Sequence, residues 1–288
     1  MKIPPEEWLQ QVNREFREKN VAVRRRPLLA IDRYCKDFRV QELRFDSAPA
    51  KAIFEWFYSN TKPESHHIGS LFTGAFYYDA CFWPVDIPVG YGRFKLEPLD
   101  CLRGMSATLK QELMTVPRDF TNYAIFWVDC LDYGYGFNDI QKFNDCSSFG
   151  MSLLINADRE LKAAISQLLE RHPNPKAAMS ARMAVEMYLK SFLIQKAGLS
   201  AAEVKAFNHR LNDLLKECRR IMPNHDILKI ESDLTAFPAI HERYTGNDLP
   251  HTTLWAAYGI AQYSATSVVR SFTNRDNRAQ LRKPPDTL

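Results

Sequence analysis

The chain has 288 residues, of which 45% are hydrophobic and 25% are charged, and this composition excludes a disordered, collagen-like or repeat-built protein. The length predicts two domains, and the formal net charge of +4 permits a nucleic-acid partner without requiring one. The N-terminus lacks the apolar core of a signal peptide, and no stretch reaches the roughly 18 apolar residues that span a bilayer. We therefore expect a cytoplasmic protein that makes no membrane contact.

The first 150 residues hold most of the Phe, Trp and Tyr residues, which predicts a change of architecture near the middle of the chain. Pro4 and Pro5 followed by two glutamates are typical of a helix start, and apolar residues continue at helical spacing to Phe16. Residues 47–60 repeat this pattern, with a serine as the capping residue and an early proline. We predict one helix in each segment.

Short aromatic runs between Gly and Pro residues then predict three strands, at 71–78, 81–85 and 91–96. Leucines and a methionine at three- and four-residue intervals predict a helix over 99–113. The almost continuously apolar run 123–130 predicts a strand covered on both faces, and the glycines of 133–138 predict a loop after it.

From residue 151 onward the apolar residues follow the 3.6-residue period of helices. Gly198 is placed to end one helix, and the Ser200 to Glu203 segment forms a capping box that begins the next. The predicted helices cover 151–171, 175–197, 200–222, a fourth segment from Asn224, and 254–272. Helices with short connections and one apolar stripe each predict an up-and-down bundle.

The predicted fold class is therefore an α+β N-terminal domain followed by an all-α up-and-down helical bundle. We place the aromatic-rich α+β domain at residues 1–147, the bundle at 148–275 and a loose polar tail at 276–288.

Three stretches of the bundle resemble the HEPN family, named for nucleotide-binding domains of higher eukaryotes and prokaryotes. Residues 184–190 (AVEMYLK) are similar to the family's second helix, and residues 209–215 (HRLNDLL) follow its H-x-L-x-x-L-L pattern. Residues 242–246 (ERYTG) resemble the turn before its last helix. The resemblance implies a HEPN-like bundle that forms a homodimer and either binds nucleotides, RNA or partner proteins, or cuts RNA without a metal.

Five residues in these stretches are the predicted ligand-binding set, namely Glu186, Lys190, His209, Arg243 and Tyr244. Glu186 and Lys190 also fit an exposed ion pair one helical turn apart. His209 lies opposite the apolar stripe if one helix runs throughout, and faces a groove if Asn208 caps a new helix.

A metal-independent ribonuclease needs a base and a phosphate-holding cation, roles that suit histidine and arginine. The fallback catalytic residues are Arg220, His225, Arg243 and His251. The spacing of Arg243 and His251 departs from the family's pattern, whereas Arg220 and His225 keep the spacing but have Ile221 in place of the polar residue. Alternatively, His225 is only a helix-start residue and His251 only follows Pro250 in a loop.

Three further groups of residues carry weaker hypotheses, because each also fits an ordinary surface or turn role. His66 and His67 offer two imidazoles on a loop, Asp129 and Asp132 follow the predicted strand, and Arg24 to Arg26 could contact phosphates.

The preferred hypothesis is a binding or regulatory protein that recognises a nucleotide, RNA or a protein partner and has no catalytic activity. The alternatives are a ribonuclease of toxin or defence type, and an enzymatic N-terminal domain that the bundle dimerises. Six scattered cysteines without a CxxC pair predict reduced thiols, and we expect neither a metal nor a cofactor. Small residues of the last helix predict the dimer face, namely Ala257, Ala261, Ser264 and Ala265.

Overall fold

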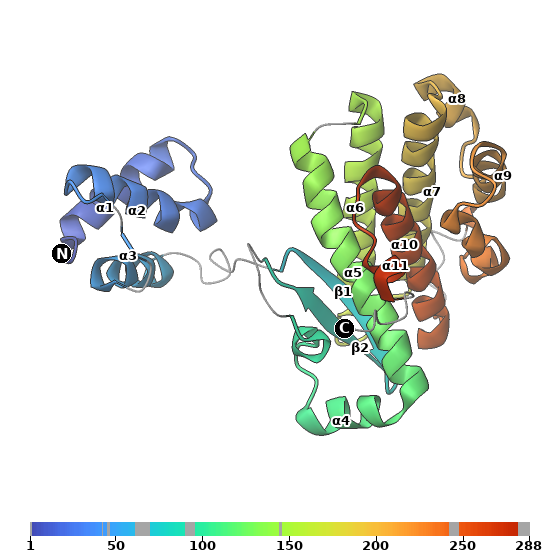
Figure 1. The fold of residues 1–288 in the computed structure, drawn as a ribbon, viewed down its shortest axis with the longest axis horizontal. Helices are drawn as coiled ribbons and strands as arrows, with labels where there is room; N and C mark the ends of the chain where they lie inside the picture. The colour runs from blue at the N-terminus through green and yellow to red at the C-terminus, as the bar shows by residue number, and fades with distance from the viewer. Residues whose placement is uncertain are drawn as a thin grey trace, which may run out of the picture. The chain divides into compact units, whose positions relative to one another are not determined.

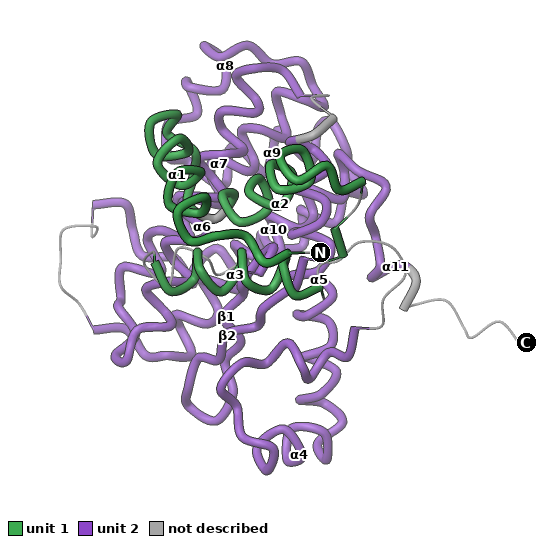
Figure 2. The backbone as a smooth tube through the Cα atoms, turned by 90° about the vertical axis from the view of Figure 1, so that its left-hand side faces the viewer, with its two compact units in different colours: residues 1–69 green, residues 70–288 purple. Residues whose placement is uncertain are grey.

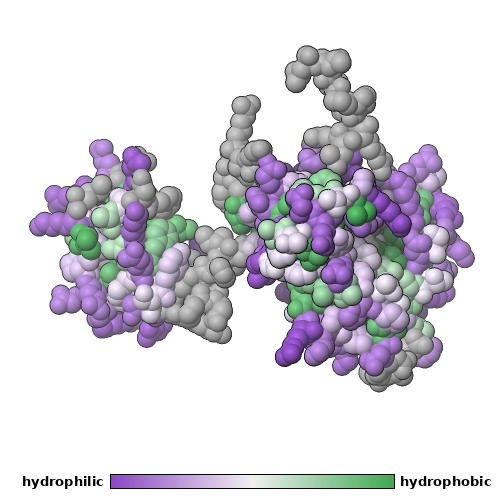
Figure 3. Space-filling model, turned by 90° about the horizontal axis from the view of Figure 1, so that it is seen from below, coloured by the Kyte–Doolittle hydropathy of each residue, from purple (hydrophilic) through white to green (hydrophobic). Residues whose placement is uncertain are grey.

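The chain divides into two compact units, residues 1–69 and 70–288, in a computed structural model (Figures 1 and 2). The structure describes residues 2–41, 43–44, 47–60, 70–89, 96–143, 146–241 and 248–281, without the side chains of Arg24, Lys142, Phe143, Gln280 and Leu281. The division thus differs from the predicted boundary between residues 147 and 148. In Figure 3, hydrophilic residues cover much of the visible surface of each unit, with smaller hydrophobic patches between them.

Unit 1 is built from helices around a small apolar core. Its helices are α1 Glu6–Glu18, the 3-10 turn Val23–Arg25, α2 Arg26–Asp37 and α3 Ala48–Ser59. The predicted helix starts at Glu6 and after Ser47 are confirmed, whereas α2 was not predicted. Arg26 is largely buried, and its guanidinium donates to the Val21 carbonyl and to Asn13 Oδ1. Arg26 therefore fastens α1 to α2, and it is not a phosphate contact.

Unit 2 combines a two-stranded hairpin with a helical bundle (Figure 1). The hairpin strands are β1 Phe72–Tyr78 and β2 Cys81–Ile87, and they pair antiparallel through a two-residue turn, Asp79 and Ala80, with positive φ at both positions. The remaining elements are η3 Pro98–Cys101, α4 Ala107–Thr115, α5 Pro117–Phe143, α6 Ser148–Leu168, α7 Lys176–Ala197, α8 Ala201–Ala206, α9 Leu211–Ile221, η4 Asp226–Ala236, α10 His251–Phe272 and α11 Asn277–Leu281. Two of the predicted strands are confirmed, and the third, at 91–96, lies almost entirely outside the described residues.

Helix α5 corrects two predictions, because residues 123–130 are helical and not a strand, and residues 133–138 continue the same helix. One side of α5 packs against the hairpin and another against α10, so apolar residues surround it. A helix buried on several sides has the same continuous apolar pattern as a strand covered on both faces. The helix predicted over 99–113 is also shorter, since α4 begins at Ala107.

The bundle packs α6 against α7, α7 against α10, and α10 against α5, with the hairpin on α5 and α6. One continuous core therefore runs from the hairpin through the bundle, across the predicted domain boundary. A buried hydrogen-bond chain reinforces it: Tyr133 Oη donates to Asp158 Oδ1 at 2.8 Å and contacts Tyr188 Oη at 2.6 Å. This chain joins α5 to α6 and α7.

Within the bundle, the Gly198 helix end and the capping box at Ser200 are confirmed. The predicted third helix is divided into α8 and α9, and the fourth is a 3-10 helix. The predicted dimer face is not available on the surface, because Ala257, Ala261, Ser264 and Ala265 are fully buried in the chain's own core. Residues 277–281 of the predicted tail form α11, and Asn277 donates to Asp132. Within the described part of the chain, no helix combines the length and the apolar character needed to cross a membrane.

Gly136 fixes how closely α5 approaches α10, because a Cβ added there would lie 2.3 Å from Val269 Cγ1. Gly136→Ala should therefore lower the free energy of unfolding by about 1 to 3 kcal/mol, since overpacking outweighs the gain in helix propensity. Urea denaturation measures the change.

Gly259 of α10 provides the matched control, because nothing lies within 4 Å of a Cβ added there. Gly259→Ala should raise the free energy of unfolding by about 0.5 to 1 kcal/mol, since alanine replaces a helix-interior glycine without a clash. Equal effects of the two substitutions would contradict the close packing of α5 on α10.

Candidate functional site

Three of the predicted ligand-binding residues meet at the break between α8 and α9. Lys190 Nζ lies 2.6 Å from Glu186 Oε1, and His209 Nδ1 lies 2.9 Å from Glu186 Oε2. Lys190 also donates to the Asn208 carbonyl at 2.8 Å. Asn208 has a φ of 49°, which interrupts the helix and turns His209 toward α7.

Most polar atoms of this group are paired within it, although the buried Arg182 Nε has no hydrogen-bond partner among the described residues. Glu186 is only 3% exposed and both of its carboxylate oxygens have partners, while Arg182 donates to the His209 carbonyl at 3.1 Å. Burial lowers the pKa of Arg182, although the Glu186 carboxylate opposes that effect. The group therefore holds the α8–α9 connection on α7, and only the His209 ring is substantially exposed. Arg243 and Tyr244 lie outside the described residues.

The fallback catalytic residues have separate structural roles. His225 begins η4, and its Nδ1 accepts the Ile227 N–H at 3.2 Å, so the ring proton is on Nε2. Arg220 pairs with Glu217 through both carboxylate oxygens. Among the described residues, no hydrogen bond or ion pair joins Arg220 to His225.

His251 is the first residue of α10, so it begins a helix and is not part of a loop. Its Nδ1 lies 3.2 Å from the Ala80 carbonyl oxygen, and a carbonyl can only accept, so Nδ1 carries the proton. The ring also meets Tyr77 and Phe82 edge-on. His251 therefore ties the hairpin turn to the start of α10.

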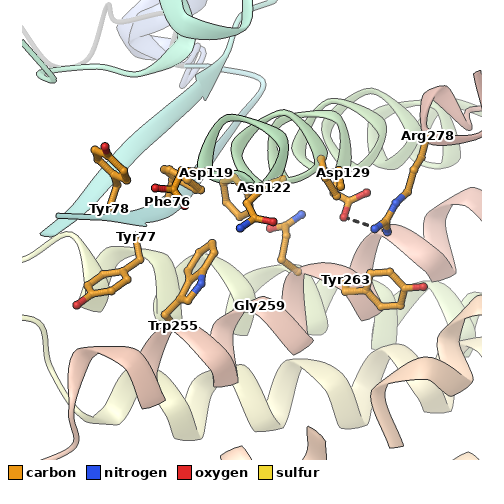
Figure 4. Close-up of a pocket in the computed structure, with 13 residues that line it drawn as sticks. Phe76, Tyr77, Tyr78, Asp119, Asn122, Asp129, Trp255, Gly259, Tyr263 and Arg278 are labelled. Carbon is orange, nitrogen blue, oxygen red and sulfur yellow. Dashed lines mark ion pairs between the residues drawn. The ribbon is translucent and has the colours of Figure 1, made fainter. Parts of the chain in front are cut away.

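The described part of the chain holds a more open site beside α10, which we call the α10 cleft (Figure 4). Its cavity volume is about 410 Å³, within the usual range for small-molecule sites. It is lined by Phe76, Tyr77, Tyr78, Asp119, Asn122, Ile125, Phe126, Asp129, Trp255, Gly259, Gln262, Tyr263 and Arg278. These residues come from β1, α5, α10 and α11.

One stripe of α10 forms the floor of the α10 cleft, with Trp255, Gly259 and Tyr263 four residues apart. Positions spaced in this way share a helix face, and eight residues rise about 12 Å along the axis. Figure 4 shows the two aromatic side chains rising from α10 with the glycine between them. Two aromatic side chains therefore project from this face of α10 with a gap between them, because Gly259 has no side chain.

The aromatic rings at both ends of the stripe are held in place. Trp255 packs edge-on against Phe76, with ring centroids 5.7 Å apart, and lies 5.4 Å from Phe126. Tyr263 donates its hydroxyl to the Asp226 carbonyl at 3.2 Å. Such fixed aromatic faces offer stacking surfaces at little entropic cost.

Charged groups form one end of the α10 cleft. Arg278 lies over the Tyr263 ring at 5.2 Å, and its Nη1 is 3.5 Å from Asp129 Oδ2. That nitrogen is buried and has no hydrogen-bond acceptor among the described residues. Burial raises the pKa of Asp129, while Arg270 and Arg278 oppose the increase.

Asp129 and Asp132 are thus one turn apart on α5, and they do not follow a strand as predicted. Arg270 bridges them: it donates to Asp129 Oδ1 at 2.8 Å and, through Nε, to Asp132 Oδ2 at 2.8 Å. Asp132 is fully buried and also accepts the backbone N–H of Asn277 at 3.1 Å. The pair of carboxylates therefore anchors α10 and α11, and with them Arg278.

Asp129 was singled out from the sequence and lines the α10 cleft, but the cleft itself was not predicted. The spacing of Trp255, Gly259 and Tyr263 was a usable signal, because it predicts two aromatic rings flanking a gap on one helix face. Arg278 carried no such signal, because it lies in the segment expected to be a loose tail.

No three His, Cys, Asp or Glu side chains converge on a possible metal site within the residues that the structure covers. His66 and His67 are outside those residues. A comparison with protein-family models finds no match, and comparisons with curated proteins and with solved structures find none.

His225 provides a test of its capping role through pH. Burial lowers its pKa below the usual 6.5, so the folded protein keeps the ring neutral while the unfolded chain takes up a proton below that pH. Stability should fall as the pH drops from about 6.5 toward the lower folded pKa. His225→Asn keeps a capping oxygen that does not titrate. The variant should therefore lack the part of the stability loss that comes from protonation of His225.

Urea denaturation from about pH 7.5 to about pH 5.5 measures the effect. Parallel stability profiles for the wild type and His225→Asn would contradict the role.

Proposed function

We propose that unit 2 is a HEPN-like binding module that holds a nucleotide in the α10 cleft and has no catalytic activity of its own. The observation that carries the proposal is the Trp255, Gly259 and Tyr263 stripe on the floor of an open cavity. The HEPN-like assignment rests on the resemblance of residues 184–190, 209–215 and 242–246 to the family's motifs and on the order of these motifs in the sequence.

The glycine at position 259, in the interior of α10, is the first feature that supports a ligand site. A glycine in a helix interior costs about 0.5 to 1 kcal/mol relative to alanine. Other helical glycines have a packing reason, since an added Cβ would lie 3.0 Å from Phe72 Cβ at Gly134 and 2.3 Å from Val269 Cγ1 at Gly136. At Gly259 an added Cβ meets nothing within 4 Å. No described residue therefore fills the space beside Gly259, and a ligand can approach the helix backbone there.

The second argument is the fit of the surrounding groups to a nucleotide. A planar base can lie over Gly259 against the Trp255 ring, and stacking contributes about 1 to 3 kcal/mol per base. Asp119 and the exposed Asn122 line the same cavity and carry groups that can pair with a base edge. The Arg278 guanidinium lines the cavity, and its planar set of donors suits a phosphate oxygen.

The proposal of binding without catalysis rests on the histidines. His225 caps η4 and His251 holds the hairpin turn, so each ring already has a structural partner. His209 shares its Nδ1 with Glu186. A base must reach the proton that it removes, and none of these three rings lines the α10 cleft.

Gly259→Leu provides the test, with AMP as the probe and isothermal titration calorimetry as the measurement. The wild type should bind AMP, and the leucine side chain should weaken binding by about tenfold or more because it occupies the space of the base. Thermal unfolding should show that the variant stays folded, since no atom opposes the new side chain at its Cβ.

Thr252→Leu is the matched control, because Thr252 is exposed on the same helix and does not line the cleft. It should bind AMP as the wild type does. Wild type that fails to bind AMP, or equal binding by wild type and Gly259→Leu, would overturn the proposal.

A further inference from the structure

A second hollow adjoins the α10 cleft, and we call it the side pocket. Its cavity volume is about 340 Å³. It shares Gly259, Tyr263 and Arg278 with the α10 cleft. Its own walls are mainly apolar, from Ile230 of η4 and from Ala256 and Ile260 of α10, with Lys229 and Asp233 also contributing.

The helix geometry explains why the two hollows are neighbours. Ala256 and Ile260 lie one residue beyond Trp255 and Gly259, so they form the adjacent stripe of the same helix. The boundary between the hollows is formed by the three residues that line both, Gly259, Tyr263 and Arg278. At Gly259 this boundary has no side chain, and no atom lies within 4 Å of a Cβ built there, so we take this position as the passage between the hollows.

The chemistry of the two hollows differs. Tyr263 and Arg278 line both hollows, but the α10 cleft adds the Trp255 ring and the Asp119 and Asp129 carboxylates, whereas the side pocket adds the buried Ile230 and Ile260. Lys229 already pairs with Asp226 at 2.5 Å, so its charge is compensated within the chain. Apolar walls favour an apolar group, because its removal from water is the source of the binding energy.

From this arrangement we infer that the natural ligand is a nucleotide whose base carries an apolar substituent, which passes over Gly259 into the side pocket. This inference rests on the proposed function, since it places the base in the α10 cleft. The base lies directly above Gly259, so a group on its edge is nearest to the passage. The phosphate stays at Arg278.

The experiment compares AMP with N6-benzyl-AMP by isothermal titration calorimetry on the full-length protein. The benzyl compound should bind about tenfold more tightly, because burial of its ring removes apolar surface from water. The benzyl phosphoester of AMP carries the same group at the other end of the molecule. It should show no gain over AMP.

Ala256→Gln tests the location, because Ala256 is exposed, lines the side pocket and does not line the α10 cleft. The glutamine should abolish the advantage of N6-benzyl-AMP and leave the affinity for AMP unchanged. Thr252→Gln makes an equivalent change on an exposed part of α10 outside both hollows, and it should keep the advantage.

The outcomes separate the inference from the function on which it rests. If AMP binds but N6-benzyl-AMP binds no better, or if its advantage survives Ala256→Gln, the inference is overturned and the α10 cleft stands. A gain for the phosphoester in place of the N6 compound also overturns it. If none of the compounds binds, the proposed function fails and the inference fails with it.

Discussion

The position of Arg270 between Asp129 and Asp132 is the constraint on which the rest of unit 2 depends. Burial lowers the pKa of Arg270, but the two carboxylates outweigh this effect and raise it above its usual value, so the side chain is charged. Removing one partner of such a buried pair typically costs about 3 to 5 kcal/mol, because the other charge is left uncompensated. The same carboxylates hold Asn277 and face Arg278, so one cluster joins α5 to α10 and also sets the charged end of the α10 cleft.

Much of the helical architecture could be predicted from the sequence, because amphipathic helices repeat their apolar residues at a period that a strand cannot share. Helices α1, α6 and α9 each follow this rule. Helix α5 does not, because it is covered by the hairpin and by α10 and its apolar residues have no clear period. Gly134 and Gly136 also favoured the wrong prediction of a loop at 133–138, because glycine occurs both in turns and where two elements pack closely.

The candidate site was predicted less well than the fold. The ligand-binding set came from the HEPN resemblance, and three of its members, Glu186, Lys190 and His209, lie in contact in the structure. The sequence could not show that their charged groups pair with one another. The α10 cleft needs β1, α5, α10 and α11 at once. No local pattern encodes such a convergence of segments almost 200 residues apart, and the tail that carries Arg278 has almost no apolar periodicity to mark it as ordered.

The central claim is that the gap at Gly259, between Trp255 and Tyr263, is where unit 2 holds its ligand. It is tested most directly by a two-dimensional NMR titration of the isotope-labelled protein with AMP. The account predicts that the largest shifts fall on the Gly259 amide and the Trp255 indole N–H, with Arg278 next to them. Shifts concentrated around His209 and Glu186, with Gly259 and Trp255 unchanged, would contradict it.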